Sequence, residues 1–133
     1  MLRIAALTLL LATPASAQSL QQRLQVGQAW EAALSEWSVL LTCSMFEPQS
    51  REMIERAWTP MRDDTLDIMA EAGWPEAGLT ELRTRAELDA MRLPGDTPLS
   101  EVVAYCNDSG DWMRGLQMMT ITMLDHDVEA ALE

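Results

Sequence analysis

Residues 26–41 read VGQAWEAALSEWSVLL, and this stretch decides the fold. Its large apolar side chains recur at intervals of three and four residues, which is the period of one face of an α-helix. Glu31 and Ser35 fall on the opposite face. Because Trp30 and Trp37 both lie on the apolar face, the helix must pack against a substantial partner surface. The pattern predicts an amphipathic helix from Leu20 to about Cys43.

A second helix is expected to follow the break at Phe46-Glu47-Pro48. Its apolar stripe opens at Pro48, runs as far as Ala70, and is ended by Gly73, a residue typical of a helix C-terminus. Thr59-Pro60 falls inside this stripe. Either Pro60 kinks one continuous helix, or Thr59 caps a new helix with Pro60 in its first turn.

The rest of the chain keeps the helical period. A third helix opens at Trp74-Pro75-Glu76 and carries Leu79, Leu82, Ala86 and Met91 on its inner face. After the turn at residues 93–96 comes a short helix through Val102 and Cys106, and a last helix is expected from about Asp111 to Ala131, burying Trp112, Leu116, Met119 and Met123. No useful stretch alternates with a period of two, so strands are not expected. The fold class predicted is all-α, a compact bundle of four to six helices.

The N-terminus has the three parts of a secretory signal peptide. Arg3 supplies the charge, residues 4–12 form an apolar run, and Ala15-Ser16-Ala17 is a small-residue cleavage site. We expect residues 1–17 to be removed and residues 18–133 to form a single helical domain, working in the periplasm or secreted. The apolar run is about half of the roughly 20 residues that cross a bilayer, so no membrane span is expected after processing. A retained N-terminal anchor is the alternative.

Cys43 and Cys106 are the only cysteines. An even cysteine count in an exported chain predicts a disulfide, here one that closes a long loop. The alternative is a pair of thiols with a redox or metal-binding role, but their wide separation is unlike a CxxC motif.

The chain is strongly acidic. Its formal charge is −12, and removal of Arg3 with the signal peptide would make it −13. Nucleic acids and anionic lipids need a basic face, so the balance argues against both as partners. The negative charge permits basic partners or cations. The alternative is that it serves only to keep the protein in solution.

Motifs for catalysis are missing from the sequence. His126 is the one histidine, and no G-x-S-x-G nucleophile elbow is present. We therefore expect a protein that is not an enzyme and needs no cofactor.

Methionine is unusually abundant, and it suggests a metal site. Met119, Met123 and His126 follow the spacing i, i+4, i+7 on the expected last helix. Thioethers with an imidazole are soft ligands suited to Cu(I). The alternative is core packing, a role that methionine fills routinely.

Two resemblances add expectations. Thr42-Cys43, the Trp58 segment ending in Ala72-Gly73-Trp74, and Gly95-Asp96 leading to Tyr105-Cys106 resemble small exported two-cysteine helical proteins of unknown function from marine and purple non-sulfur alphaproteobacteria. This resemblance covers about residues 40–110 and implies a fold and a compartment. The segments 42–46 and 102–106 also resemble the periplasmic acid-stress chaperones, small helical proteins held by one disulfide.

The leading hypothesis is therefore an exported helical protein that acts by contact with a protein partner, as chaperone, accessory subunit or inhibitor. Its abundance of Trp and Met is typical of binding surfaces. The alternative is a soft-metal carrier that binds copper through its Met-rich C-terminal segment.

Overall fold

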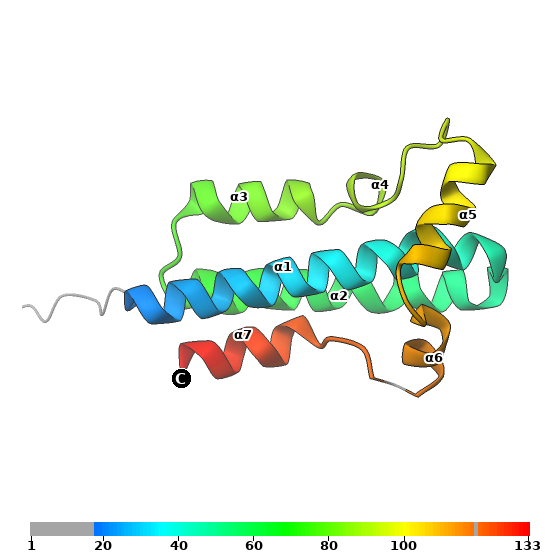
Figure 1. The fold of residues 1–133 in the computed structure, drawn as a ribbon. Helices are drawn as coiled ribbons and strands as arrows, with labels where there is room; N and C mark the ends of the chain where they lie inside the picture. Colours follow the sequence, from blue (N-terminus) through cyan, green and yellow to red (C-terminus); the bar gives the residue numbers. More distant parts are fainter. Residues whose placement is uncertain (1–17, 119) are drawn as a thin grey trace, which may run out of the picture.

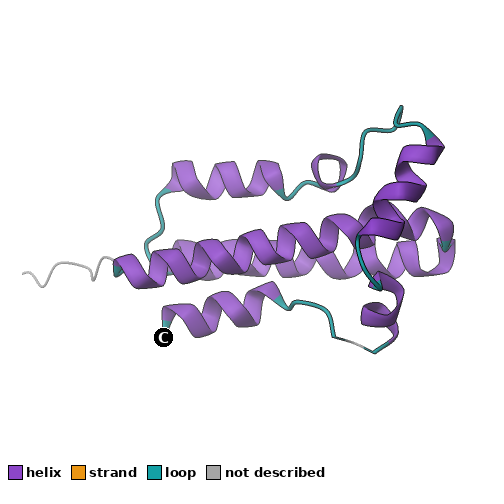
Figure 2. Ribbon diagram, in the orientation of Figure 1, coloured by secondary structure: helices purple, strands orange, loops and turns teal. Residues whose placement is uncertain are grey.

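The computed structural model describes residues 18–118 and 120–133, so the expected signal peptide lies outside the described residues. Within them the chain is helical, without a strand, as Figure 2 shows. The all-α fold predicted from the sequence is confirmed. The helices are α1 (Leu20–Cys43), the 3-10 helix η1 (Ser44–Phe46), α2 (Pro48–Glu71), α3 (Glu76–Arg85), α4 (Leu88–Met91), α5 (Leu99–Asp108), α6 (Trp112–Gln117) and α7 (Leu124–Leu132).

The two longest helices form the centre of the molecule. In Figure 1, α1 and α2 run antiparallel as a hairpin, with α3 and α4 along one side and α7 along the other. Helix α7 packs against both α1 and α2, and α5 crosses α1 near the end of the hairpin where η1 joins the two helices. The main core lies between these layers. No helix in the described residues is long and apolar enough to cross a membrane.

Helix α1 begins where the sequence predicts because Ser19 caps it. The Ser19 Oγ accepts a hydrogen bond from the Gln22 N–H at 3.1 Å, and the Gln22 side chain accepts one from the Ser19 N–H at 3.0 Å. This reciprocal pair is a capping box, which satisfies donors that the first helical turn leaves without partners.

Helix α2 is continuous through Pro60, which settles the alternative left open by the sequence. Proline lacks an N–H and so cannot donate to the carbonyl four residues earlier. Trp58 and Met61, on either side of Pro60, are both buried in the core, whereas Pro60 itself is exposed. Burial of these neighbours outweighs the lost hydrogen bond, so the helix continues.

Three buried tryptophans tie the layers together. The Trp30 indole Nε1 lies 3.1 Å from the Met69 sulfur, which joins α1 to α2. The Trp37 indole donates to the Thr122 carbonyl at 3.0 Å, and the Trp58 indole donates to the Ala86 carbonyl at 2.9 Å. The Trp37 and Trp58 rings also contact each other, with centroids 5.3 Å apart.

Both of these carbonyls lie where a predicted helix is interrupted. Ala86 separates α3 from α4, which the sequence predicted as one helix. Arg62 Nη1 also lies 3.5 Å from the Ala86 carbonyl oxygen. A carbonyl inside a helix already accepts from the residue four positions later, whereas one at a break can accept from an indole.

The prediction of one long last helix from Asp111 to Ala131 is wrong. Residues 120–123 are not helical and lie between α6 and α7, so the described residues hold seven α-helices instead of four to six. The backbone at Thr122 is held by α1: its carbonyl accepts from Trp37, and its N–H donates to both Glu36 carboxylate oxygens at 3.2 Å. The β-branched run Thr120-Ile121-Thr122 also has low helix propensity. Tertiary hydrogen bonds therefore replace helical ones here.

The indole hydrogen bonds can be tested by Trp37→Phe and Trp58→Phe. Each change keeps an aromatic ring but removes the N–H. The Thr122 carbonyl then loses its indole donor, and the Ala86 carbonyl keeps only the 3.5 Å contact with Arg62. We expect each to lower the free energy of unfolding by about 1–3 kcal/mol, measured by urea denaturation. Trp74→Phe, at a half-buried indole beside the main core, is the control and should cost less. Equal losses in all three variants would contradict the role given to the hydrogen bonds.

Candidate functional site

The disulfide predicted from the cysteine count is present. Cys43, at the end of α1, is bonded to Cys106 in α5, with the two Cα atoms 5.7 Å apart. Both cysteines are buried. The bond holds α5 across the end of the α1–α2 hairpin.

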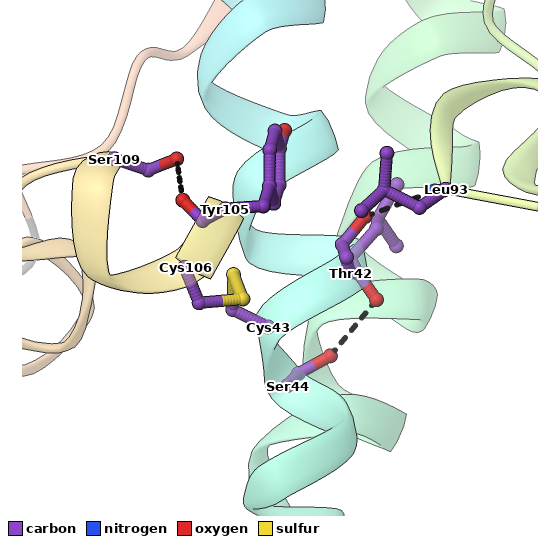
Figure 3. Close-up of a disulfide and its surroundings, with 8 residues drawn as sticks. Thr42, Cys43, Ser44, Leu93, Tyr105, Cys106 and Ser109 are labelled. Carbon is purple, nitrogen blue, oxygen red and sulfur yellow. Dashed lines mark hydrogen bonds between the residues drawn. A yellow bond between two sulfur atoms is a disulfide. The ribbon is translucent and has the colours of Figure 1, made fainter. Parts of the chain in front are cut away.

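A second, small core surrounds the disulfide. It consists of the two cysteines and Val102, with four partly buried side chains packed against it: Val39, Leu93, Tyr105 and Trp112. Figure 3 shows the Tyr105 side chain near the disulfide and Leu93 beside Thr42. The Leu93 N–H donates to the Thr42 Oγ1 at 3.3 Å, and burial raises the pKa of the Tyr105 hydroxyl. Because this core contains few buried apolar side chains, we expect α5 to depend on the covalent bond more than the helices of the main core do.

The apolar face of α5 is wider than this small core requires. Leu99, Val102, Val103 and Cys106 follow the i, i+3, i+4, i+7 spacing of one helical face. Val102 and Cys106 are buried, whereas Leu99 is 62% exposed and Val103 is 40% exposed. Part of an apolar helical face therefore meets solvent.

Helix η1 adds two more exposed apolar side chains at the same end of the molecule. Met45 is 45% exposed and Phe46 is 47% exposed. Met45 and Val102 line one groove of about 190 Å³, which links η1 to α5. We call the exposed set the disulfide-end surface; its members are Met45, Phe46, Leu99 and Val103.

Two arginines form the polar part of this groove. Arg51 Nε lies 3.0 Å from Glu55 Oε1, and Arg92 Nη2 binds the same oxygen. Arg92 Nη1 also lies 3.7 Å from Asp89. The hydrogen bond from Arg51 and the nearby charge of Arg92 lower the pKa of the Glu55 carboxyl below 4.5, although desolvation opposes the shift. The network connects α2 to the segment after α4.

The three residues predicted to bind Cu(I), Met119, Met123 and His126, do not lie on one helix. Met119 lies outside the described residues. Met123 is the residue before α7 and is 48% exposed, whereas the sequence predicted it to be buried. The neighbouring Thr122 backbone is hydrogen-bonded to Glu36 and Trp37 and is not helical. The His126 side chain is 73% exposed, with Nε2 4.0 Å from Asp125. The Cu(I) site stays a prediction.

The described residues, 18–118 and 120–133, include no group of three or more His, Cys, Asp or Glu side chains that could hold a metal ion. The disulfide end offers exposed apolar side chains, a groove and two arginines held by ion pairs. Sequence reasoning missed Met45, Arg51, Arg92 and Leu99. Of these, only Leu99 could have been found from the sequence, because it is an apolar residue at the helical spacing of α5.

Comparison with protein-family models, with curated proteins and with solved structures finds no match to this chain. Its function is therefore argued from its own residues.

Removal of the disulfide should free α5 and leave the main core folded. Closing a loop with a sequence separation of 63 residues stabilises a fold by about 4 kcal/mol through chain entropy. We expect Cys43→Ala/Cys106→Ala to lower the free energy of unfolding by about this amount in urea denaturation. Hydrogen exchange should show faster exchange in α5 than in the α1–α2 hairpin. Loss of protection to the same extent in all helices would contradict two separate cores.

The stability contributed by Glu55 should depend on pH. Because its folded-state pKa is lowered, the carboxylate stabilises the protein above its unfolded pKa, near 4.5, and this contribution is lost as the pH falls through the folded-state value. Glu55→Gln should therefore destabilise the protein at neutral pH, with a difference from wild type that shrinks below 4.5. Glu52→Gln, in an exposed i,i+4 pair with Arg56, is the control and should show little effect. A difference for Glu55→Gln that is constant with pH would be the contrary result.

Proposed function

We propose that the protein is exported and acts by contact with a protein partner, as chaperone, accessory subunit or inhibitor, through the disulfide-end surface. The observation that carries this proposal is the exposure of Met45, Phe46, Leu99 and Val103 at one end of the molecule, where Met45 and the buried Val102 of α5 line a groove. Scattered exposed apolar residues are ordinary, but a group gathered at one end with a polar centre is typical of a protein interaction site.

The residue types also favour a protein partner. Methionine adapts its shape to different surfaces, and aromatic side chains are common among residues that dominate binding energy. The groove that Met45 lines also contains Arg51 and Arg92, whose guanidinium groups can orient a carboxylate or backbone carbonyl of the partner. The exposed apolar side chains would supply affinity, and the two arginines would fix the orientation of the partner.

Export is supported by two features. Disulfides persist in oxidising compartments outside the cytoplasm, and the Cys43–Cys106 bond supports one of the two cores. The N-terminal sequence has the charge, apolar run and cleavage site of a signal peptide.

The proposal is tested by changing the surface without changing the core. Met45→Ser/Val103→Ser replaces two exposed side chains, and Leu24→Ser is the matched control because Leu24 is 57% exposed near the other end of α1. Proteins co-purified with each variant from the extracytoplasmic fraction of the producing cells should be compared quantitatively. We expect the partner to be retained by Leu24→Ser and reduced about tenfold by the double variant, which corresponds to about 1.4 kcal/mol.

The three roles give different results with the purified partner. An inhibitor lowers the activity of the partner, an accessory subunit raises it, and a chaperone suppresses aggregation of an unfolding reporter enzyme. Each effect should be lost in the double variant, at neutral and at acidic pH. Co-purification that is unchanged by Met45→Ser/Val103→Ser would refute the assigned surface.

A further inference from the structure

A second cleft lies between α1 and α6 and shares no lining residue with the groove that Met45 lines. Its volume is about 370 Å³, within the range of small-ligand sites. One wall carries Glu36 and Val39 from α1, and the other carries Asp111 and Trp112 at the start of α6. Ile121, from the segment before α7, also lines it.

The carboxylate of Glu36 is held in place at this cleft. Both of its oxygens accept from the Thr122 N–H at 3.2 Å, and the Thr122 hydroxyl donates to it as well. The neighbouring Trp37 indole fixes the Thr122 carbonyl. Neutral donors of this kind orient a carboxylate without cancelling its charge.

Asp111 adds a second carboxylate, also in a defined place. Its Oδ1 accepts from the Arg114 N–H at 3.0 Å and so caps α6. Two acidic side chains therefore line the cleft, and no basic side chain does so in the part of the chain that the structure describes. The whole protein carries a formal charge of −12, which adds to the negative potential.

The half-buried indole of Trp112 supplies an aromatic surface between these charges. The faces of indole rings attract cations, and Val39 and Ile121 add apolar surface for a hydrocarbon stem. We propose that this cleft binds an organic cation, an ammonium or guanidinium group carried on an apolar stem. Such a group occurs on a lysine or arginine side chain of a basic partner and on a free alkyl amine.

The proposal is tested by isothermal titration calorimetry on the purified, disulfide-bonded chain. The probes are acetyl-arginine-amide for a protein side chain and 1,5-diaminopentane for a free amine, with 1-pentanol as the uncharged comparison. We expect saturable binding of at least one cation, weakened by salt, and a shift of the Trp112 indole resonance in NMR spectra. Preference for the arginine probe assigns the site to a partner side chain, and preference for the diamine assigns it to a free amine.

Two variants with the same change in charge separate the site from the general field of the protein. Asp111→Asn removes one cleft carboxylate and keeps the helix cap, because Asn caps helices as well as Asp. Asp108→Asn removes the same charge from an exposed position in α5 that does not line the cleft. We expect Asp111→Asn to weaken cation binding about fivefold and Asp108→Asn less than about twofold. Trp112→Leu should weaken it about threefold.

Three results would overturn the proposal: no saturable binding of either cation, equal binding of 1-pentanol, or equal weakening by Asp108→Asn and Asp111→Asn. The test is independent of the proposed partner surface, since Met45→Ser/Val103→Ser should leave cation binding unchanged.

Discussion

A buried indole N–H must find an acceptor, and this constraint explains the arrangement of the helices around the α1–α2 hairpin. Trp37 and Trp58 contact each other at the centre of the core, and their N–H groups point to the two outer layers. Carbonyls within regular helices are already used, so the acceptors come from places where the helix is interrupted, at Ala86 and Thr122. The same contacts that satisfy the indoles therefore decide where α3 ends and where α7 is held.

The disulfide end is held together by a different interaction from the main core. The main core is a continuous apolar cluster between α1, α2 and the outer layers, whereas α5 has only the small core around Cys43 and Cys106. A covalent bond holds α5 where apolar burial alone is limited, which leaves Leu99 and Val103 exposed. A segment held in this way can present apolar side chains to solvent without losing its position. This is the physical basis for placing the partner surface there.

The two proposed surfaces differ in electrostatics. In the groove beside Met45, Arg51 and Arg92 share the Glu55 carboxylate and Arg92 also lies near Asp89, in a chain whose overall charge is strongly negative. The cleft beside Trp112 has carboxylates only among its charged lining residues in the described chain. The charged residues that line the groove are basic and those that line the cleft are acidic, so the two favour different ligands. The protein can therefore combine an interface with a partner and a separate site for a cationic group.

The sequence by itself determined the helical class, the start of α1 at Leu20, the buried face carrying Trp30 and Trp37, and the disulfide, because helical period and cysteine count are local or compositional signals. It left the path through Pro60 open and predicted an unbroken helix through Thr122. Only the tertiary structure decided these. Burial of Trp58 and Met61 outweighs the proline, and at Thr122 a hydrogen bond donated to Glu36 and one accepted from Trp37 replace helical bonds. The groove and the cleft also depend on residues far apart in the chain. Arg51 and Arg92 bind the same Glu55 oxygen, and Glu36 and Trp112 line the same cleft, only once the helices have packed. No local sequence pattern therefore predicts either site.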